Sequence, residues 1–168
     1  MSDAPPKPET AKKGRKRRRR TRRKRDEPVG YELRVSDWDY YYGFSVSDPK
    51  SRFDTGPYRE LATLTFKGAL VRPEGLPYRE ATLTLSARAG MMDKRYDQTP
   101  HSIGGLSAYG ETLNAYVFIP VGRLAELTAV ALSGRVQVVN IVGTRLRYRS
   151  GSVQSISLNT EIEEEEDE

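Results

Sequence analysis

Apolar residues occupy every second position in most segments between residues 31 and 162, and this alternation constrains the fold more than any other feature. Successive side chains of an extended strand point to opposite faces, so a period of two predicts strands buried on one face. Turn residues separate about seven or eight such strands. The alternating or strongly apolar segments are 31–47, 58–71, 78–89, 112–119, 135–142, 146–148 and 153–162. The sequence therefore predicts an all-β, mainly antiparallel body, either a β-sandwich or a Greek-key or barrel-like fold, with at most one short helix.

The first of these segments changes phase near its middle. Leu33 and Val35 alternate on odd positions, whereas a second set alternates on even positions. The even-numbered set consists of Trp38, Tyr40, Tyr42, Phe44 and Val46. The change at Ser36 and Asp37 predicts a β-bulge or a bend. We interpret the even-numbered set as facing the core; the alternative is that its exposed rings stack the bases of a single-stranded nucleic acid.

Two of the segments resemble each other. Residues 57–66 match residues 77–85 with one inserted residue, and the turn between them contains residues 72–75. In both segments apolar residues fall on one face and threonines on the other. This arrangement predicts two neighbouring strands of a hairpin, with a row of threonines on the solvent side.

One segment has the spacing of a helix. Its apolar residues Leu124, Leu127 and Ala131 predict a short helix over residues 124–132, ended by Gly134. Farther along the chain, Ser150 and Gly151 form a hairpin-turn signal. Residues 90–111 are the longest irregular stretch, and a loop of this length tends to be functional or mobile.

The chain offers few groups for catalysis. It has no cysteine and a single histidine, His101, which excludes disulfides, thiol nucleophiles and Cys-ligated zinc. A Ser-His-Asp triad would need His101, but no Gly-x-Ser-x-Gly elbow is present. Asp93, Asp97 and His101 recur every four residues, as metal ligands on a helix would, but Pro100 and nearby glycines favour a polar loop. We therefore expect no enzyme, no metal and no cofactor.

A dense basic segment precedes the alternating body. Twelve of the fourteen residues from 12 to 25 are Lys or Arg, and none is apolar. The like charges repel and nothing offsets the ordering entropy, so the segment is expected to be disordered. A flexible polycation binds polyanions by releasing their counterions, and Arg also forms paired hydrogen bonds with phosphate. The predicted nucleic-acid contacts in this segment are Lys12, Lys13, Arg15, Lys16, Arg17, Arg18, Arg19, Arg20, Arg22, Arg23, Lys24 and Arg25.

Three further arginines follow a period of two near the end of the body. Arg145, Arg147 and Arg149 would lie on one face of a strand that also contains Leu146 and Tyr148. Such a face is either a track for phosphates beside the basic segment or an ordinary solvated strand face. We include the three arginines among the predicted nucleic-acid contacts.

Charge divides the chain into three parts. Residues 1–27 carry thirteen Lys or Arg and four Asp or Glu, and are predicted to form a disordered basic arm. Residues 28–160 are predicted to form a single β domain. Residues 161–168 carry seven acidic residues and no basic one, and are predicted to form a disordered acidic tail. The overall net charge of +5 conceals these oppositely charged ends.

These features predict a non-enzymatic protein that binds nucleic acid, DNA or RNA, or another polyanion. The basic arm would make phosphate contacts that are independent of sequence, and the β domain would position the arm or form an oligomer. The alternative is a structural, self-assembling subunit, coat-like or scaffold-like, whose arm binds a packaged polyanion. A homo-oligomer fits either function.

A membrane partner is not expected. No apolar run approaches the length of about 18 residues that a spanning helix needs, and the basic arm has no apolar face. The expected location is the cytoplasm or nucleoid, or the nucleus if the source is eukaryotic.

Overall fold

The computed structural model describes residues 27–47, 56–89, 91 and 101–160 of the chain. Seven strands and one helix occupy these ranges. In chain order they are β1 (Pro28–Val46), β2 (Tyr58–Arg72), β3 (Glu80–Arg88), β4 (Gly104–Tyr109), β5 (Thr112–Pro120), α1 (Val121–Leu132), β6 (Val138–Thr144) and β7 (Ser150–Asn159). No helix in the described ranges is long and apolar enough to cross a membrane.

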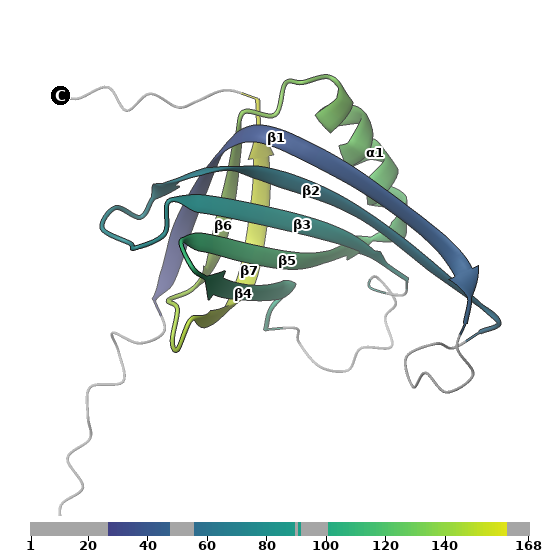
Figure 1. The fold of residues 1–168 in the computed structure, drawn as a ribbon, viewed down its shortest axis with the longest axis horizontal. Helices are drawn as coiled ribbons and strands as arrows, with labels where there is room; N and C mark the ends of the chain where they lie inside the picture. Colours follow the sequence, from purple (N-terminus) through teal and green to yellow (C-terminus); the bar gives the residue numbers. More distant parts are fainter. Residues whose placement is uncertain (1–26, 48–55, 90, 92–100, 161–168) are drawn as a thin grey trace, which may run out of the picture.

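The strands form one sheet that closes on itself. The order around the barrel is β1-β2-β3-β5-β4-β7-β6, and β6 returns to pair with β1. Of the pairs between these strands, β3 with β5 is parallel and the others are antiparallel. The prediction of an all-β, mainly antiparallel, barrel-like body with one short helix is confirmed, and closure of the sheet selects the barrel over the sandwich (Figure 1).

The apolar residues that alternate along the strands form the core. The inward positions of each strand are apolar, and ten side chains among them are fully buried. These residues are Leu33, Leu64, Phe66, Leu83, Leu85, Leu113, Val117, Val139, Ile141 and Val153. Burial of one such side chain contributes about 1.5–3 kcal/mol, so their sum is the main favourable term for folding.

The predicted β-bulge in β1 is confirmed. The register of β1 against β2 shifts between Val35 and Asp37. The Ser36 hydroxyl donates a hydrogen bond of 3.3 Å to the Lys67 carbonyl oxygen across the irregularity. The backbones approach so closely here that a Cβ atom at Gly68 would lie 1.9 Å from the Arg34 carbonyl oxygen. Glycine is therefore required at this point of β2.

The predicted hairpin of β2 and β3 is also confirmed. The two strands pair in antiparallel register, and the hydroxyls of Thr65 and Thr84 lie 3.3 Å apart on the outer face. The helix begins at Val121, slightly earlier than predicted, and buries Leu124 and Ala131 against the barrel. It contacts β2, β3 and β5.

The interpretation of residues 90–111 as irregular is wrong for the segment 104–109, which forms β4. Leu106 and Ala108 alternate into the core there. Glycines at 104 and 105 conceal the strand because glycine is normally unfavourable within strands. Residues 90 and 92–100 lie outside the described ranges, so the expected polar loop with Asp93 and Asp97 is not tested.

The buried hydroxyl of Tyr31 gives a pH-dependent prediction. Tyr31 is 2% exposed, and its hydroxyl donates a 3.0 Å hydrogen bond to the Thr144 carbonyl oxygen. Burial raises the pKa of this hydroxyl, against smaller opposing effects from the backbone at Leu146 and the charge of Arg145. Above about pH 10 the unfolded chain loses this proton while the folded chain keeps it. Folding stability should therefore fall as pH rises through this range, by at most about 1.4 kcal/mol per pH unit for this group.

Tyr31→Phe should cost about 1 kcal/mol at neutral pH through the lost hydrogen bond, and should flatten the decline above pH 10. Urea unfolding between pH 8 and 11 measures both effects. Tyr109→Phe, which removes a hydroxyl from an exposed side chain, is the control. An equally steep decline in Tyr31→Phe and the unmodified chain would contradict the assignment.

Candidate functional site

The start of β1 lies beside the connection between β6 and β7. Pro28 pairs with Thr144, the last residue of β6, and the connecting segment begins with Arg145. Arg25 precedes Pro28 by three positions, and three residues span at most about 11 Å even when fully extended. The basic arm is therefore attached at the end of the barrel that carries Arg145, although residues 12–25 themselves lie outside the described ranges.

The three arginines of this connection do not lie on one strand face, so that part of the prediction is wrong. Arg147 and Ser150 exchange backbone hydrogen bonds of 2.8 and 2.9 Å, which close a two-residue turn at Tyr148 and Arg149. Both turn residues have positive φ, 49° and 66°. Non-glycine residues seldom adopt this conformation, so the sequence pointed to the following Ser150 and Gly151 instead.

The turn nevertheless presents its charges to solvent. Arg145, Arg147 and Arg149 are exposed, and no ion pair involves them among the residues that the structure describes. The Arg149 carbonyl oxygen accepts a 2.9 Å hydrogen bond from the Ala108 backbone N–H, which holds the turn against the end of β4.

Two exposed tyrosines stand among these arginines. Tyr148 is fully exposed at the tip of the turn, and Tyr109, the last residue of β4, is 83% exposed. We call this group, Arg145, Arg147, Tyr148, Arg149 and Tyr109, the basic end of the barrel. Its flat rings and unpaired guanidinium groups suit stacking and phosphate contacts.

Carboxylates are also present near the basic end. Glu74 lines a hollow of about 480 Å³ together with Tyr31 and Arg145. Glu111 is exposed in the turn between β4 and β5, where its carbonyl oxygen accepts hydrogen bonds from the backbone of Arg79 and Glu80. Among the described residues the basic end therefore carries charges of both signs, and the twelve Lys and Arg of residues 12–25 precede it in the sequence.

The outer face of β4 and β5 is aromatic and uncharged. Strands β4, β5, β6 and β7 contain no Lys, Arg, Asp or Glu. On β5, Tyr116 and Phe118 point outward and meet edge to face, with ring centroids 5.2 Å apart. The guanidinium carbon of Arg88, at the end of β3, lies 5.1 Å from the Phe118 centroid. A hollow of about 320 Å³ adjoins this group.

The interpretation of the even-numbered residues of β1 as core is wrong beyond Trp38. Trp38 packs against the core, but Tyr40, Tyr42, Phe44 and Val46 are 43–76% exposed. The pairing of β1 with β6 ends at Arg34, and β2 pairs with β3 only from Thr63 onward. Residues 42–46 of β1 and 58–62 of β2 therefore extend past the rest of the sheet as a two-stranded ribbon (Figure 1). Alternation marks which side chains share a face, but it does not show whether anything covers that face.

The aromatic face of this ribbon is poorly suited to phosphate. Its rings include Phe44 and Tyr58, which stack at a centroid distance of 5.3 Å. A groove of about 310 Å³ separates the ribbon from α1, and Glu60 is the charged side chain that lines it, beside Tyr40 and Tyr42. A carboxylate in the groove repels phosphate, so base stacking here lacks the electrostatic support that the basic end has.

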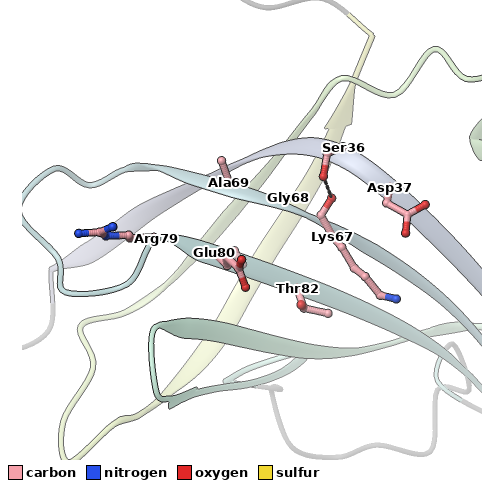
Figure 2. Close-up of a pocket in the computed structure, with 9 residues that line it drawn as sticks. Ser36, Asp37, Lys67, Gly68, Ala69, Arg79, Glu80 and Thr82 are labelled. Atoms are coloured by element: carbon pink, nitrogen blue, oxygen red, sulfur yellow. Dashed lines mark hydrogen bonds between the residues drawn. The ribbon is translucent and has the colours of Figure 1, made fainter.

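A third hollow lies on the outer face beside the bulge. Figure 2 shows Asp37 and Lys67 on one side of this space of about 460 Å³ and Arg79 on the other. Glu80 also lines it, so both signs of charge are present and no large field of one sign results. His101 is exposed before β4, and no group of three metal-ligating side chains gathers within the ranges the structure covers.

Comparison of the chain with protein-family models, with curated proteins and with solved structures gave no match.

Proposed function

We propose that this protein is a non-enzymatic nucleic-acid-binding protein. Its basic arm makes phosphate contacts that are independent of sequence, and the basic end of the barrel extends and orients them. The observation that carries the proposal is the pairing of Pro28 with Thr144, which attaches the arm beside Arg145, Arg147 and Arg149.

Counterion release gives this arrangement its affinity. Each phosphate neutralised by Lys or Arg releases condensed cations, so contacts from the arm and from the barrel add on the same strand. The arm alone contributes charge without orientation. The turn between β6 and β7 is held by hydrogen bonds to its own strands and to β4, so its arginines supply fixed points for the polymer.

Salt dependence of binding tests this proposal. If about eight phosphates of duplex DNA are neutralised, log K should fall against log salt with a slope of about −7. Deletion of residues 1–25 should remove most of this slope for duplex and single-stranded oligonucleotides. Fluorescence anisotropy between 50 and 300 mM salt measures it.

The matched control is deletion of residues 1–11, which removes the Pro-rich lead and keeps the basic run. It should leave the slope nearly unchanged. Thermal unfolding of both truncated chains establishes that the barrel is intact. Equal binding by the unmodified chain and the chain lacking residues 1–25 at every salt concentration would refute the proposal.

A self-assembling subunit is the second candidate, and the ribbon favours it. Residues 36–46 of β1 pair with β2 on one edge and with no other strand in the described ranges. An open edge beside exposed aromatic rings is a surface on which strands of other chains pair. Light scattering with and without nucleic acid distinguishes the candidates, because a monomer under both conditions excludes self-assembly.

A further inference from the structure

Tyr116 stands on the outer face of the barrel among small neighbours. Its cross-strand partners are Thr84 on β3 and Gly105 on β4. Neither partner is large enough to cover an aromatic ring, and Tyr116 remains 41% exposed. A large ring surrounded by small residues on a sheet leaves its surface available to a flat ligand.

Gly105 keeps the space beside this ring open. A Cβ atom added at Gly105 would find its nearest neighbour 3.8 Å away, at the Gly151 carbonyl oxygen, so the backbone alone does not require glycine here. Gly105 and Tyr116 line the hollow of about 320 Å³ together with Gly104, Phe118 and Arg88. Met91, Ser102 and Ile103 also line the hollow, and the two glycines leave one face of the Tyr116 ring uncovered by a neighbouring side chain on β4.

Phe118 and Arg88 line the same hollow beside Tyr116. The edge-to-face contact of Phe118 with Tyr116, with an interplanar angle of 79°, restrains the tyrosine ring. Arg88 lies over Phe118 and brings a positive charge to the rim of the hollow. Among the described residues no carboxylate lines this hollow, in contrast to the groove beside the ribbon, where Glu60 does.

An uncharged path connects the hollow to the basic end. Moving along β4 and β5, the outward residues that follow are Ser107 and Asn114, which pair with each other, and then Tyr109. Tyr116 lies four positions along β5 from Thr112, the partner of Tyr109, and four steps along a strand cover about 13 Å. One short strand of nucleic acid can therefore contact Tyr109 and Tyr116 while its backbone reaches the arginines of the turn.

We propose that Tyr116, with Gly105, Phe118 and Arg88, forms a base-binding site for single-stranded nucleic acid. A base stacks on Tyr116 over Gly105, and Arg88 faces the sugar-phosphate backbone. Bases within a duplex are already stacked on one another, so an unpaired strand is the ligand that fits. This inference rests on the proposed function and adds the form of the polymer to it.

Binding of a base-bearing and an abasic oligonucleotide of the same length tests the site. Tyr116→Ala should weaken binding of a twelve-nucleotide deoxythymidine strand by about 5- to 150-fold, which corresponds to the usual range for loss of one stacked base. Binding of the abasic strand, which offers phosphates without bases, should not change. Tyr116→Phe should preserve the stacking and restore binding of the base-bearing strand.

Two further variants make the test specific. Gly105→Val fills the hollow from an outward position and should reduce binding of the base-bearing strand while sparing the abasic one. Tyr42→Ala removes an exposed tyrosine from the ribbon and should leave binding of both oligonucleotides unchanged.

Equal losses on both strands, or no loss on either with Tyr116→Ala, would overturn the base site. If the unmodified chain binds the abasic strand as well as the base-bearing one, the base site fails while phosphate binding stands; if it binds neither strand, both proposals fail.

Discussion

Neutralising the three arginines of the β6–β7 turn is expected to weaken binding of a single-stranded oligonucleotide about 100-fold in 0.1 M salt. Each phosphate contact on a single strand contributes about 0.7 to the slope of log K against log salt, so loss of three contacts flattens the slope by about 2. The variant combines Arg145→Gln, Arg147→Gln and Arg149→Asn. Asparagine suits position 149 because that residue has a φ of 66°. Anisotropy titrations at several salt concentrations give both affinity and slope.

The matched control neutralises three exposed arginines away from the basic end, Arg59, Arg123 and Arg135. It changes the net charge by the same amount. Arg123 lies on α1, where it pairs with Glu126 at 2.6 Å, and Arg59 lies on the ribbon. We expect a much smaller effect on affinity and slope. If this control weakens binding as much as the turn variant does, overall charge rather than position governs binding, and the basic end loses its assigned role.

Much of the barrel could be predicted from local pattern. Leu83 and Leu85, for example, alternate with threonines, and both are fully buried as that alternation requires. The bulge was predictable because a change of phase, as at Ser36, requires an extra residue if both halves of a strand are to face the same core. These features depend on residues close together in the sequence, which is why the sequence alone suffices for them.

Three of the predictions made from the sequence are wrong for the same reason. The structure at each of these positions depends on contacts with residues that are far away in the sequence. Gly104 and Gly105 look like loop residues until their pairing with β5 is known. Tyr148 and Arg149 adopt positive φ because the strands on either side of them close a hairpin at that point. The rings of the ribbon are exposed because β6 pairs with β1 only as far as Arg34. No local pattern contains this information.

The candidate site likewise combines features that the sequence reveals with features that only the structure reveals. Composition alone identifies the basic arm and the three arginines, but their proximity follows from the pairing of Pro28 with Thr144. Tyr116 was not singled out, because an outward aromatic residue in an alternating strand looks like any other. Its small neighbours are Thr84 and Gly105, on two different strands, and only the sheet order brings them together.

Gly104→Ala is expected to destabilise the barrel by about 3 kcal/mol, the upper part of the usual range for forced backbone shifts. A Cβ atom at Gly104 would lie 2.0 Å from the Tyr116 carbonyl oxygen and 2.8 Å from the Val117 Cα atom. Both are backbone atoms of β5, so the collision cannot be relieved by rotating a side chain, and β4 must move away from its partner.

Gly105→Ala is the matched control, one residue farther along β4. The same methyl group there meets nothing closer than 3.8 Å. Because alanine loses less backbone entropy than glycine in a strand, this variant should be neutral or more stable by about 0.5 kcal/mol. Urea unfolding followed by the fluorescence of Trp38, the single tryptophan, measures both variants. Equal stability of the two alanine variants would contradict the close approach of β4 to β5 and, with it, the register that places Gly105 beside Tyr116.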